Sequence, residues 1–85
     1  MCVVGAGAAG ITLARKLLES GIDVVLLESG GIDFDPEIAA LNEGEITGHD
    51  YYDLENARLR FFGGSTAIWG GRCAELDPID FAKRS

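Results

Sequence analysis

Hydrophobic positions follow two regular patterns in the first third of the chain. The apolar run from Cys2 to Val4 ends at a glycine, which is typical of a buried parallel strand. Between Ala8 and Ser20, apolar residues recur at helical spacing, at Ile11, Ala14, Leu17 and Leu18. Gly21 follows as a candidate C-cap, and a second strand, apolar on both faces, runs from Asp23 to Glu28. We therefore expect a strand, a helix and a second parallel strand in the right-handed βαβ arrangement.

Beyond the second strand the pattern is less regular. Ser29 to Gly31 predicts a loop, and Asp35 before Pro36 predicts an N-cap with proline at the first position of a short helix that ends at Gly44. Residues 49–56 are polar and aromatic without a period, which predicts an irregular excursion. Weaker elements complete the prediction: a strand or extended segment over 58–62, a short helix over 63–69, a strand over 72–76 and a helix that begins at 77.

The turn between the first strand and the helix has glycine at three spaced positions. Gly5 lets the chain turn sharply, Gly7 lets a pyrophosphate approach the backbone, and Gly10 lets the helix pack closely on the strand. Ala8 and Ala9 are small and do not block that approach. The helix N-terminus then offers free N–H groups to a diphosphate. The spacing therefore predicts a phosphate-binding turn.

Glu28 stands at the end of the second strand, about twenty positions after the turn. Its carboxylate is placed to accept hydrogen bonds from the hydroxyls of an adenosine ribose, and its charge disfavours the 2′-phosphate of NADP. The turn has a strand before it, a helix after it and this acidic residue, the three contexts that confirm the motif. A glycine-rich turn with an unrelated, solvated glutamate is the alternative. FAD and NAD share this motif.

Composition narrows the classes of partner. The net charge is −7, with 7 Lys and Arg against 14 Asp and Glu, which argues against nucleic acid. No apolar run is long enough to span a bilayer and no signal peptide is visible, so the default expectation is a cytoplasmic location. Cys2 and Cys73 have neither metal-ligand nor disulfide-framework spacing, and we expect no metal site.

Two longer motifs carry a family resemblance. They are Glu28-Ser29-Gly30-Gly31 and the stretch Leu59-Arg60-Phe61-Phe62-Gly63-Gly64-Ser65-Thr66-Ala67-Ile68-Trp69-Gly70-Gly71, followed by Leu76-Asp77-Pro78-Ile79-Asp80-Phe81. The chain resembles the N-terminal part of the glucose–methanol–choline (GMC) oxidoreductase family, closest to its sugar- and polyol-oxidising bacterial members. All but residues 34–56 take part. The resemblance implies an α/β fold: residues 1–85 as the N-terminal part of a Rossmann-like FAD-binding domain, incomplete and without its substrate domain.

The resemblance also implies which residues contact FAD. Gly64, Ser65 and Thr66 would contact the diphosphate, and residues 67–70 would lie near the flavin. Two glycines and two hydroxyls at a helix start agree with an anion-binding concavity. The residues alone leave open that Ser65 or Thr66 caps the helix. The complete predicted cofactor-binding set is Gly5, Gly7, Ala8, Ala9, Gly10, Glu28, Ser29, Gly64, Ser65, Thr66, Trp69 and Gly70.

Two positions depart from common family patterns. Trp69 stands where many members have Asn, although the sugar-oxidising members often have Trp. Some relatives attach the flavin covalently through a histidine in this turn, where this chain has Ile68. Ile68 has no nucleophile, so the resemblance implies non-covalent FAD.

Three further polar side chains have no assigned role. His49 is the only histidine, and in a polar loop it is expected to be solvated, although histidine suits proton transfer. Arg58 and Arg60 would share a face if their segment were a strand. They would then pair with the diphosphate or with Glu55, and a surface pair is the favoured interpretation.

The resemblance implies oxidation of CH–OH groups in an alcohol or sugar, with hydride passing to flavin N5. The family's base is a histidine near the C-terminus of a much longer chain, and no residue here matches it. We therefore predict no catalytic residue, and expect that these 85 residues alone neither bind FAD tightly nor turn over substrate. Three alternatives stay open: part of an NAD-dependent dehydrogenase, a flavoenzyme of other chemistry such as a monooxygenase, and a truncated product without activity.

Overall fold

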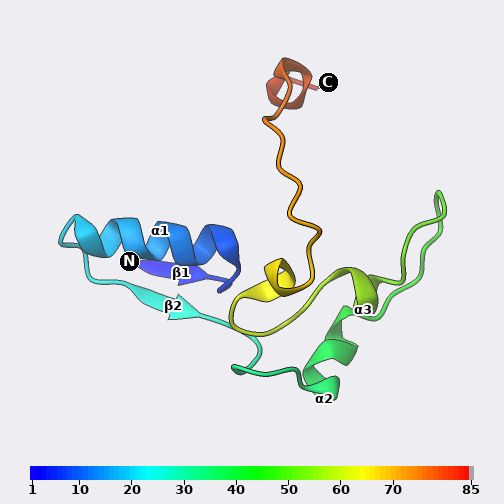
Figure 1. Cartoon of the computed structure of the whole chain (residues 1–85), viewed down its shortest axis with the longest axis horizontal. Helices are drawn as coiled ribbons and strands as arrows, with labels where there is room; N and C mark the ends of the chain where they lie inside the picture. Colours follow the sequence, from blue (N-terminus) through cyan, green and yellow to red (C-terminus); the bar gives the residue numbers. More distant parts are fainter. Residues whose placement is uncertain (85) are drawn as a thin grey trace.

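The structure is a computed structural model that describes residues 1–84 (Figure 1). It combines one long helix, a two-stranded sheet and several single turns of helix. In chain order the elements are β1 (Cys2–Val4), α1 (Ala8–Glu19), β2 (Val25–Leu27), α2 (Pro36–Ala39), η1 (Ala40–Asn42), α3 (Leu54–Ala57), η2 (Gly64–Ala67) and η3 (Pro78–Phe81), where η marks a 3-10 helix.

The sheet pairs β1 with β2 in parallel, with Val3 opposite Leu26. The helix α1 connects the two strands and covers one face of the sheet (Figure 1). Gly5 N–H donates to the carbonyl of Leu27 at 2.7 Å, so the ladder continues into the glycine turn. The predicted strand, helix and parallel strand are therefore confirmed, although β2 is shorter than the predicted 23–28.

The C-terminus of α1 ends in a Schellman motif. Gly21 has φ of +76°, and its N–H donates to the carbonyl of Leu18 at 2.9 Å. The N–H of Ile22 donates to the carbonyl of Leu17 at 3.0 Å. These two bonds satisfy carbonyls that the helix end would leave free, and glycine adopts the left-handed conformation without steric cost. Gly21 therefore terminates the helix as predicted.

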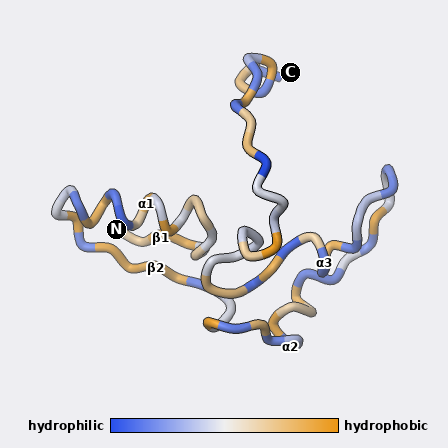
Figure 2. Tube along the Cα trace, in the orientation of Figure 1, coloured by the Kyte–Doolittle hydropathy of each residue, from blue (hydrophilic) through white to orange (hydrophobic). Residues whose placement is uncertain are grey.

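The core lies between α1 and one face of the sheet. Val3, Ala6 and Ala14 are buried there. Side chains alternate across a strand, so Val25 and Leu27 lie on the other face and are 59% and 50% exposed. The second strand is apolar on both faces as predicted, but among the described residues only one of those faces is covered, by α1. Figure 2 shows this apolar run along β2.

Residues 29–84 contain only short elements. Asp35 caps α2 as predicted, because its Oδ1 accepts from Glu37 N–H at 2.9 Å. The turn α3 forms at Leu54, inside the segment predicted to be irregular. No strand forms over 58–62, which leaves the extended alternative for that segment. The strand expected over 72–76 does not form, and the helix expected over 63–69 is one 3-10 turn.

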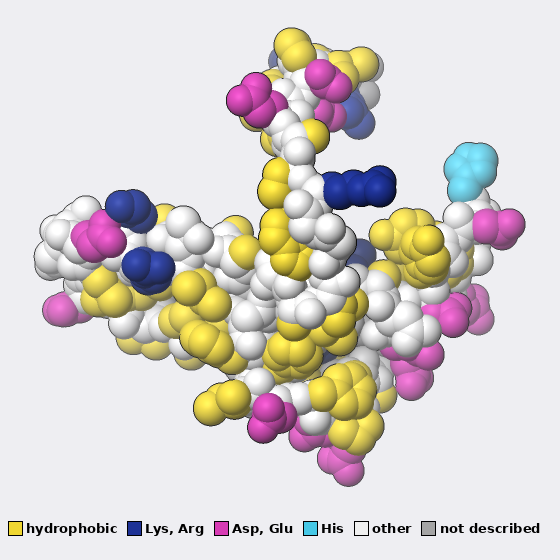
Figure 3. Space-filling model, viewed as in Figure 1, with side chains coloured by type: hydrophobic (Ala, Val, Ile, Leu, Met, Phe, Trp, Pro, Cys, Tyr) yellow, Lys and Arg dark blue, Asp and Glu magenta, His cyan; other side chains and the backbone are white. Residues whose placement is uncertain are grey.

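The overall shape is open. The radius of gyration is 15.7 Å, whereas a compact domain of this length has about 12 Å. Two arms extend from the body in Figure 1: the loop between η1 and α3, and the segment that leads from η2 to η3. Residues 31–57 contain eight Asp or Glu and no Lys or Arg, and Figure 3 shows acidic side chains gathered over this part. No helix among residues 1–84 is long and apolar enough to cross a membrane.

Candidate cofactor-binding site

The glycine turn between β1 and α1 is closed by a close backbone contact. A Cβ on Gly10 would lie 1.9 Å from the carbonyl oxygen of Gly5, so only glycine lets the helix start against the turn. A Cβ on Gly7 would meet no atom within 4 Å. The space beside Gly7 is therefore open to a ligand, while the space beside Gly10 is filled by the protein itself.

The N-terminus of α1 has donors without a side-chain partner. Gly7 is its N-cap residue and makes no side-chain cap, and the first turn has no acidic residue. The N–H groups of Ala8, Ala9 and Gly10 therefore face outward at the positive end of a 12-residue helix. Such an end binds an anionic group such as a diphosphate.

Glu28 follows β2 and reaches back to the glycine turn. Its Oε2 accepts from Ala6 N–H at 2.7 Å, and its Oε1 accepts from Gly30 N–H and Ser29 Oγ, both at 3.2 Å. The Ala6 hydrogen bond is the main cause that lowers the pKa of Glu28; partial burial raises that pKa, and the Gly30 and Ser29 bonds lower it further. Glu28 is therefore ionised at neutral pH.

The second glycine motif docks directly on the first. Gly63 N–H donates to the carbonyl of Ala6 at 2.8 Å. Gly64 is buried and has φ of +62°, and a Cβ there would lie 3.2 Å from the Cα of Gly7. The two motifs, which lie more than fifty residues apart, therefore form one surface, which we call the glycine cradle (residues 5–10 and 63–66).

The two hydroxyls of the second motif have different partners. Ser65 Oγ accepts from Leu59 N–H at 3.0 Å, which leaves its own proton free to donate. Thr66 Oγ1 donates its proton to the carbonyl of Gly63. Gly63 is the N-cap residue of η2, and no side chain caps that turn. The capping alternative for Ser65 and Thr66 is therefore wrong, and of the two only Ser65 keeps its hydroxyl proton free for a ligand.

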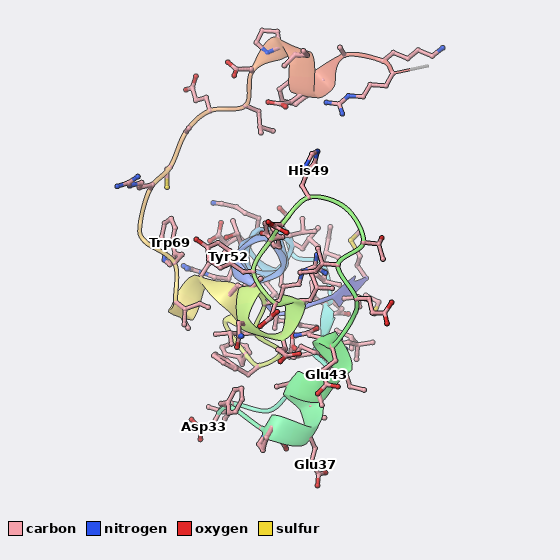
Figure 4. All side chains as sticks on the ribbon, turned by 90° about the vertical axis from the view of Figure 1, so that its right-hand side faces the viewer. Asp33, Glu37, Glu43, His49, Tyr52 and Trp69 are labelled. Atoms are coloured by element: carbon pink, nitrogen blue, oxygen red, sulfur yellow. The ribbon has the colours of Figure 1, made fainter. Side chains whose placement is uncertain are left out.

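Trp69 and Gly70 lie apart from the glycine cradle. Both residues follow η2 at the base of the C-terminal arm, and Trp69 is 55% exposed (Figure 4). His49 stands at the tip of the loop before α3 and points away from the body (Figure 4). The structure of residues 1–84 thus brings together ten of the twelve predicted site residues. Trp69 and Gly70 are the two that lie outside this group.

Arg60 makes contacts that its sequence pattern did not predict. Its Nε donates to Ser29 Oγ at 3.1 Å, and its Nη1 donates to Asn42 Oδ1 at 3.3 Å. The predicted surface pair with Glu55 is absent among the described residues. The one sequence feature that could have indicated a role for Arg60 near the site is its position three residues before Gly63.

The fold and the glycine cradle define a dinucleotide-binding protein. Residues 1–85 match the family model described as FAD dependent oxidoreductase (DAO), and the chain belongs to this family. The 6'''-hydroxyparomomycin C oxidase of Streptomyces lividus is 30% identical over 92 aligned residues, which cover 95% of this chain and 16% of that protein. The chain therefore spans about a sixth of the length of this curated relative. No solved structure matches the chain.

The family shows that the cofactor is FAD, which confirms that prediction. The matching model identifies an FAD-dependent oxidoreductase and does not identify the GMC family in particular. The residues present fit FAD: the open space beside Gly7, the free amides of α1 and the ionised Glu28 complement a diphosphate and a ribose.

Proposed function

We propose that this chain binds the adenosine-diphosphate half of FAD in an enzyme that oxidises CH–OH groups of alcohols or sugars. The docking of Gly63 and Gly64 on the first glycine turn supports this most strongly, because it joins two phosphate-binding motifs into one surface. Residues 1–85 would then form part of a Rossmann-like FAD-binding domain whose substrate domain lies outside this chain.

Each part of the glycine cradle has a proposed role. The amides of Ala8, Ala9 and Gly10, with the free proton of Ser65, bind the diphosphate. Glu28 accepts from the adenosine ribose. Residues 67–70 lie near the flavin in this proposal. FAD is held without a covalent bond.

Two observations support the substrate class. Residues 59–71 resemble the corresponding stretch in sugar- and polyol-oxidising GMC proteins. The relative in Streptomyces lividus is named as an oxidase of a hydroxylated compound. Bound FAD supplies the hydride acceptor. Residues 1–84 supply binding and orientation, and the base that takes the hydroxyl proton comes from outside them.

The reaction can be tested with the full-length protein under anaerobic conditions. Addition of primary alcohols or sugars is expected to bleach the visible flavin band and to yield the matching carbonyl product. Oxygen incorporation into the product would instead indicate a monooxygenase and overturn the proposed reaction.

The affinity of residues 1–85 alone for FAD has a separate test. The 85-residue chain, expressed alone, is expected to purify without colour, because its described sheet has only two strands and the proposed contacts involve the adenosine-diphosphate half of FAD. A yellow sample with flavin equimolar to protein would contradict this.

In the full-length protein, Ser65→Ala is expected to weaken FAD about tenfold, because a charge-assisted hydrogen bond is lost. Thr66→Val is expected to cause a smaller loss.

A further inference from the structure

Arg60 is connected to Glu28 through a single hydroxyl. Arg60 Nε donates to Ser29 Oγ at 3.1 Å, and Ser29 Oγ donates to Glu28 Oε1 at 3.2 Å. We propose that Arg60 is a positioning residue that fixes the Glu28 carboxylate through Ser29 for the adenosine ribose. The inference rests on the role proposed above for Glu28.

The direction of the protons follows from the chemistry of the three groups. A guanidinium has only donors, so Ser29 Oγ must be the acceptor in its bond with Arg60. The single proton of Ser29 is then directed to Glu28, which as a carboxylate has only acceptors. Without Arg60 the Ser29 hydroxyl would rotate freely between the carboxylate and water. Arg60 therefore fixes the hydroxyl, and the hydroxyl fixes one oxygen of Glu28.

The other oxygen of Glu28 is left with room for a ligand. A carboxylate accepts about four hydrogen bonds, two on each oxygen. Oε1 already accepts from Ser29 and Gly30, whereas Oε2 accepts only from Ala6 N–H. One acceptor position is therefore open, on Oε2. A ribose hydroxyl needs one such acceptor in a fixed direction.

Arg60 itself is held on both sides. Its Nη1 donates to Asn42 Oδ1, and Asn42 Nδ2 donates to the carbonyl of Arg58, both at 3.3 Å. Phe62 N–H donates to the carbonyl of Gly31 at 2.8 Å, which ties the segment of Arg60 to the loop that follows β2. The guanidinium thus uses two nitrogens of its rigid fork, and a lysine ammonium lacks this fixed geometry.

The test uses apoprotein of the full-length chain and two probes: FAD, and an FAD analogue whose adenosine ribose lacks both hydroxyls. Arg60→Met is expected to weaken FAD about tenfold and to leave the affinity for the analogue unchanged. Glu28→Gln is expected to weaken FAD at least as much. Because both act on one contact, the double variant should bind FAD no more weakly than Glu28→Gln alone. Arg60→Lys is expected to restore part of the loss.

The matched control is Arg58→Met, which removes a neighbouring arginine whose side chain has no hydrogen bond among residues 1–84, and it should leave both affinities unchanged. Ser29→Ala breaks the link while keeping Arg60, and it serves if Arg60→Met does not fold. An equal loss for FAD and the analogue, additive losses in the double variant, or no loss at all would each overturn the inference. If Glu28→Gln itself leaves FAD affinity unchanged, the ribose role of Glu28 in the proposed function fails as well.

Discussion

Residues 1–28 and residues 29–84 acquire their structure by different means. The first part contains all the buried apolar side chains, Val3, Ala6 and Ala14, and is held by the ladder of β1 with β2 and by helix packing. In the second part the only buried residue is Gly64, and it is buried against Gly7 of the first part. Residues 1–28 fold from a regular hydrophobic pattern. In residues 29–84, the start of the second glycine motif is ordered by its contact with residues 1–28.

The same difference bears on the proposed FAD site. The first part provides a rigid turn and the end of a helix, which suit a fixed diphosphate. The second part contributes Ser65 and Arg60 from segments with little regular structure of their own. Changes at close backbone contacts, as at Gly10 and Gly64, should therefore affect stability, whereas changes at Gly7, Ser65 or Arg60 should affect binding more than stability.

The largest effect is expected at Gly10. A methyl group in Gly10→Ala would overlap the carbonyl of Gly5, so the turn or the helix must move. We expect a loss of about 2–3 kcal/mol in the free energy of unfolding, together with loss of FAD. Urea denaturation followed by circular dichroism, with flavin content, measures both. Gly7→Ala is the contrast: its methyl meets no protein atom, so stability should be kept while FAD binding falls. Equal stabilities for the two variants would contradict the close contact at Gly10.

The next effect is expected at Gly64, where the two regions meet. Gly64→Ala places a side chain in the left-handed conformation and against Gly7, which costs about 1–2 kcal/mol. Hydrogen exchange should show loss of protection at the Gly63 amide while α1 stays protected. Gly48→Ala is the control, since a Cβ there meets open space. A protected Gly63 amide in Gly64→Ala would show that the docking does not depend on this glycine.

A smaller and local effect is expected at Asp35. Asp35→Ala removes the cap of α2 and should destabilise that helix by about 1 kcal/mol. Amides of residues 37–42 should exchange faster, and those of β1, α1 and β2 should not change. Asp33→Ala is the control, because Asp33 makes no hydrogen bond among the described residues. Faster exchange in β1 would mean that the two regions unfold together.

The smallest effect concerns acid stability. The pKa of Glu28 is lowered from its ordinary value of 4.5, mainly by the Ala6 N–H, so its contribution is fully present above that pH. The contribution is lost as pH falls through the lowered value. Glu28→Gln should therefore flatten the acid side of a plot of unfolding free energy against pH. Glu19→Gln, which removes an exposed ion pair with Lys16, should keep the wild-type slope. An unchanged slope in Glu28→Gln would contradict the lowered pKa.

The sequence predicted the first region well for a physical reason. Helical spacing, a terminal glycine and two apolar runs are local signals, and α1 and the parallel strands form where those signals lie. Leu18 was the exception: it was assigned to the apolar face but is 58% exposed, because α1 packs on the sheet through a narrower stripe. Helical periodicity predicts which side of a helix is apolar. How many residues on that side are buried depends on the surface against which the helix packs.

The second region was predicted less well because its contacts are not local. Arg58 to Phe62 forms no strand, since it runs across the end of β2 and makes only scattered backbone bonds. The link from Arg60 to Ser29 joins residues 31 positions apart, which no periodic pattern reports. The position of Glu28 after a strand predicts its role, but no sequence pattern predicts its hydrogen bond with the backbone of Ala6.

The bond from Phe62 N–H to the Gly31 carbonyl closes the long excursion between them into a loop with fixed ends. The entropy cost of closing a flexible loop grows slowly with length, by about 0.6 kcal/mol for each doubling. Residues 43–53, far from both ends, can therefore gain or lose residues at little cost while the ends stay in register. Changes of length in this loop would therefore leave the glycine cradle unchanged.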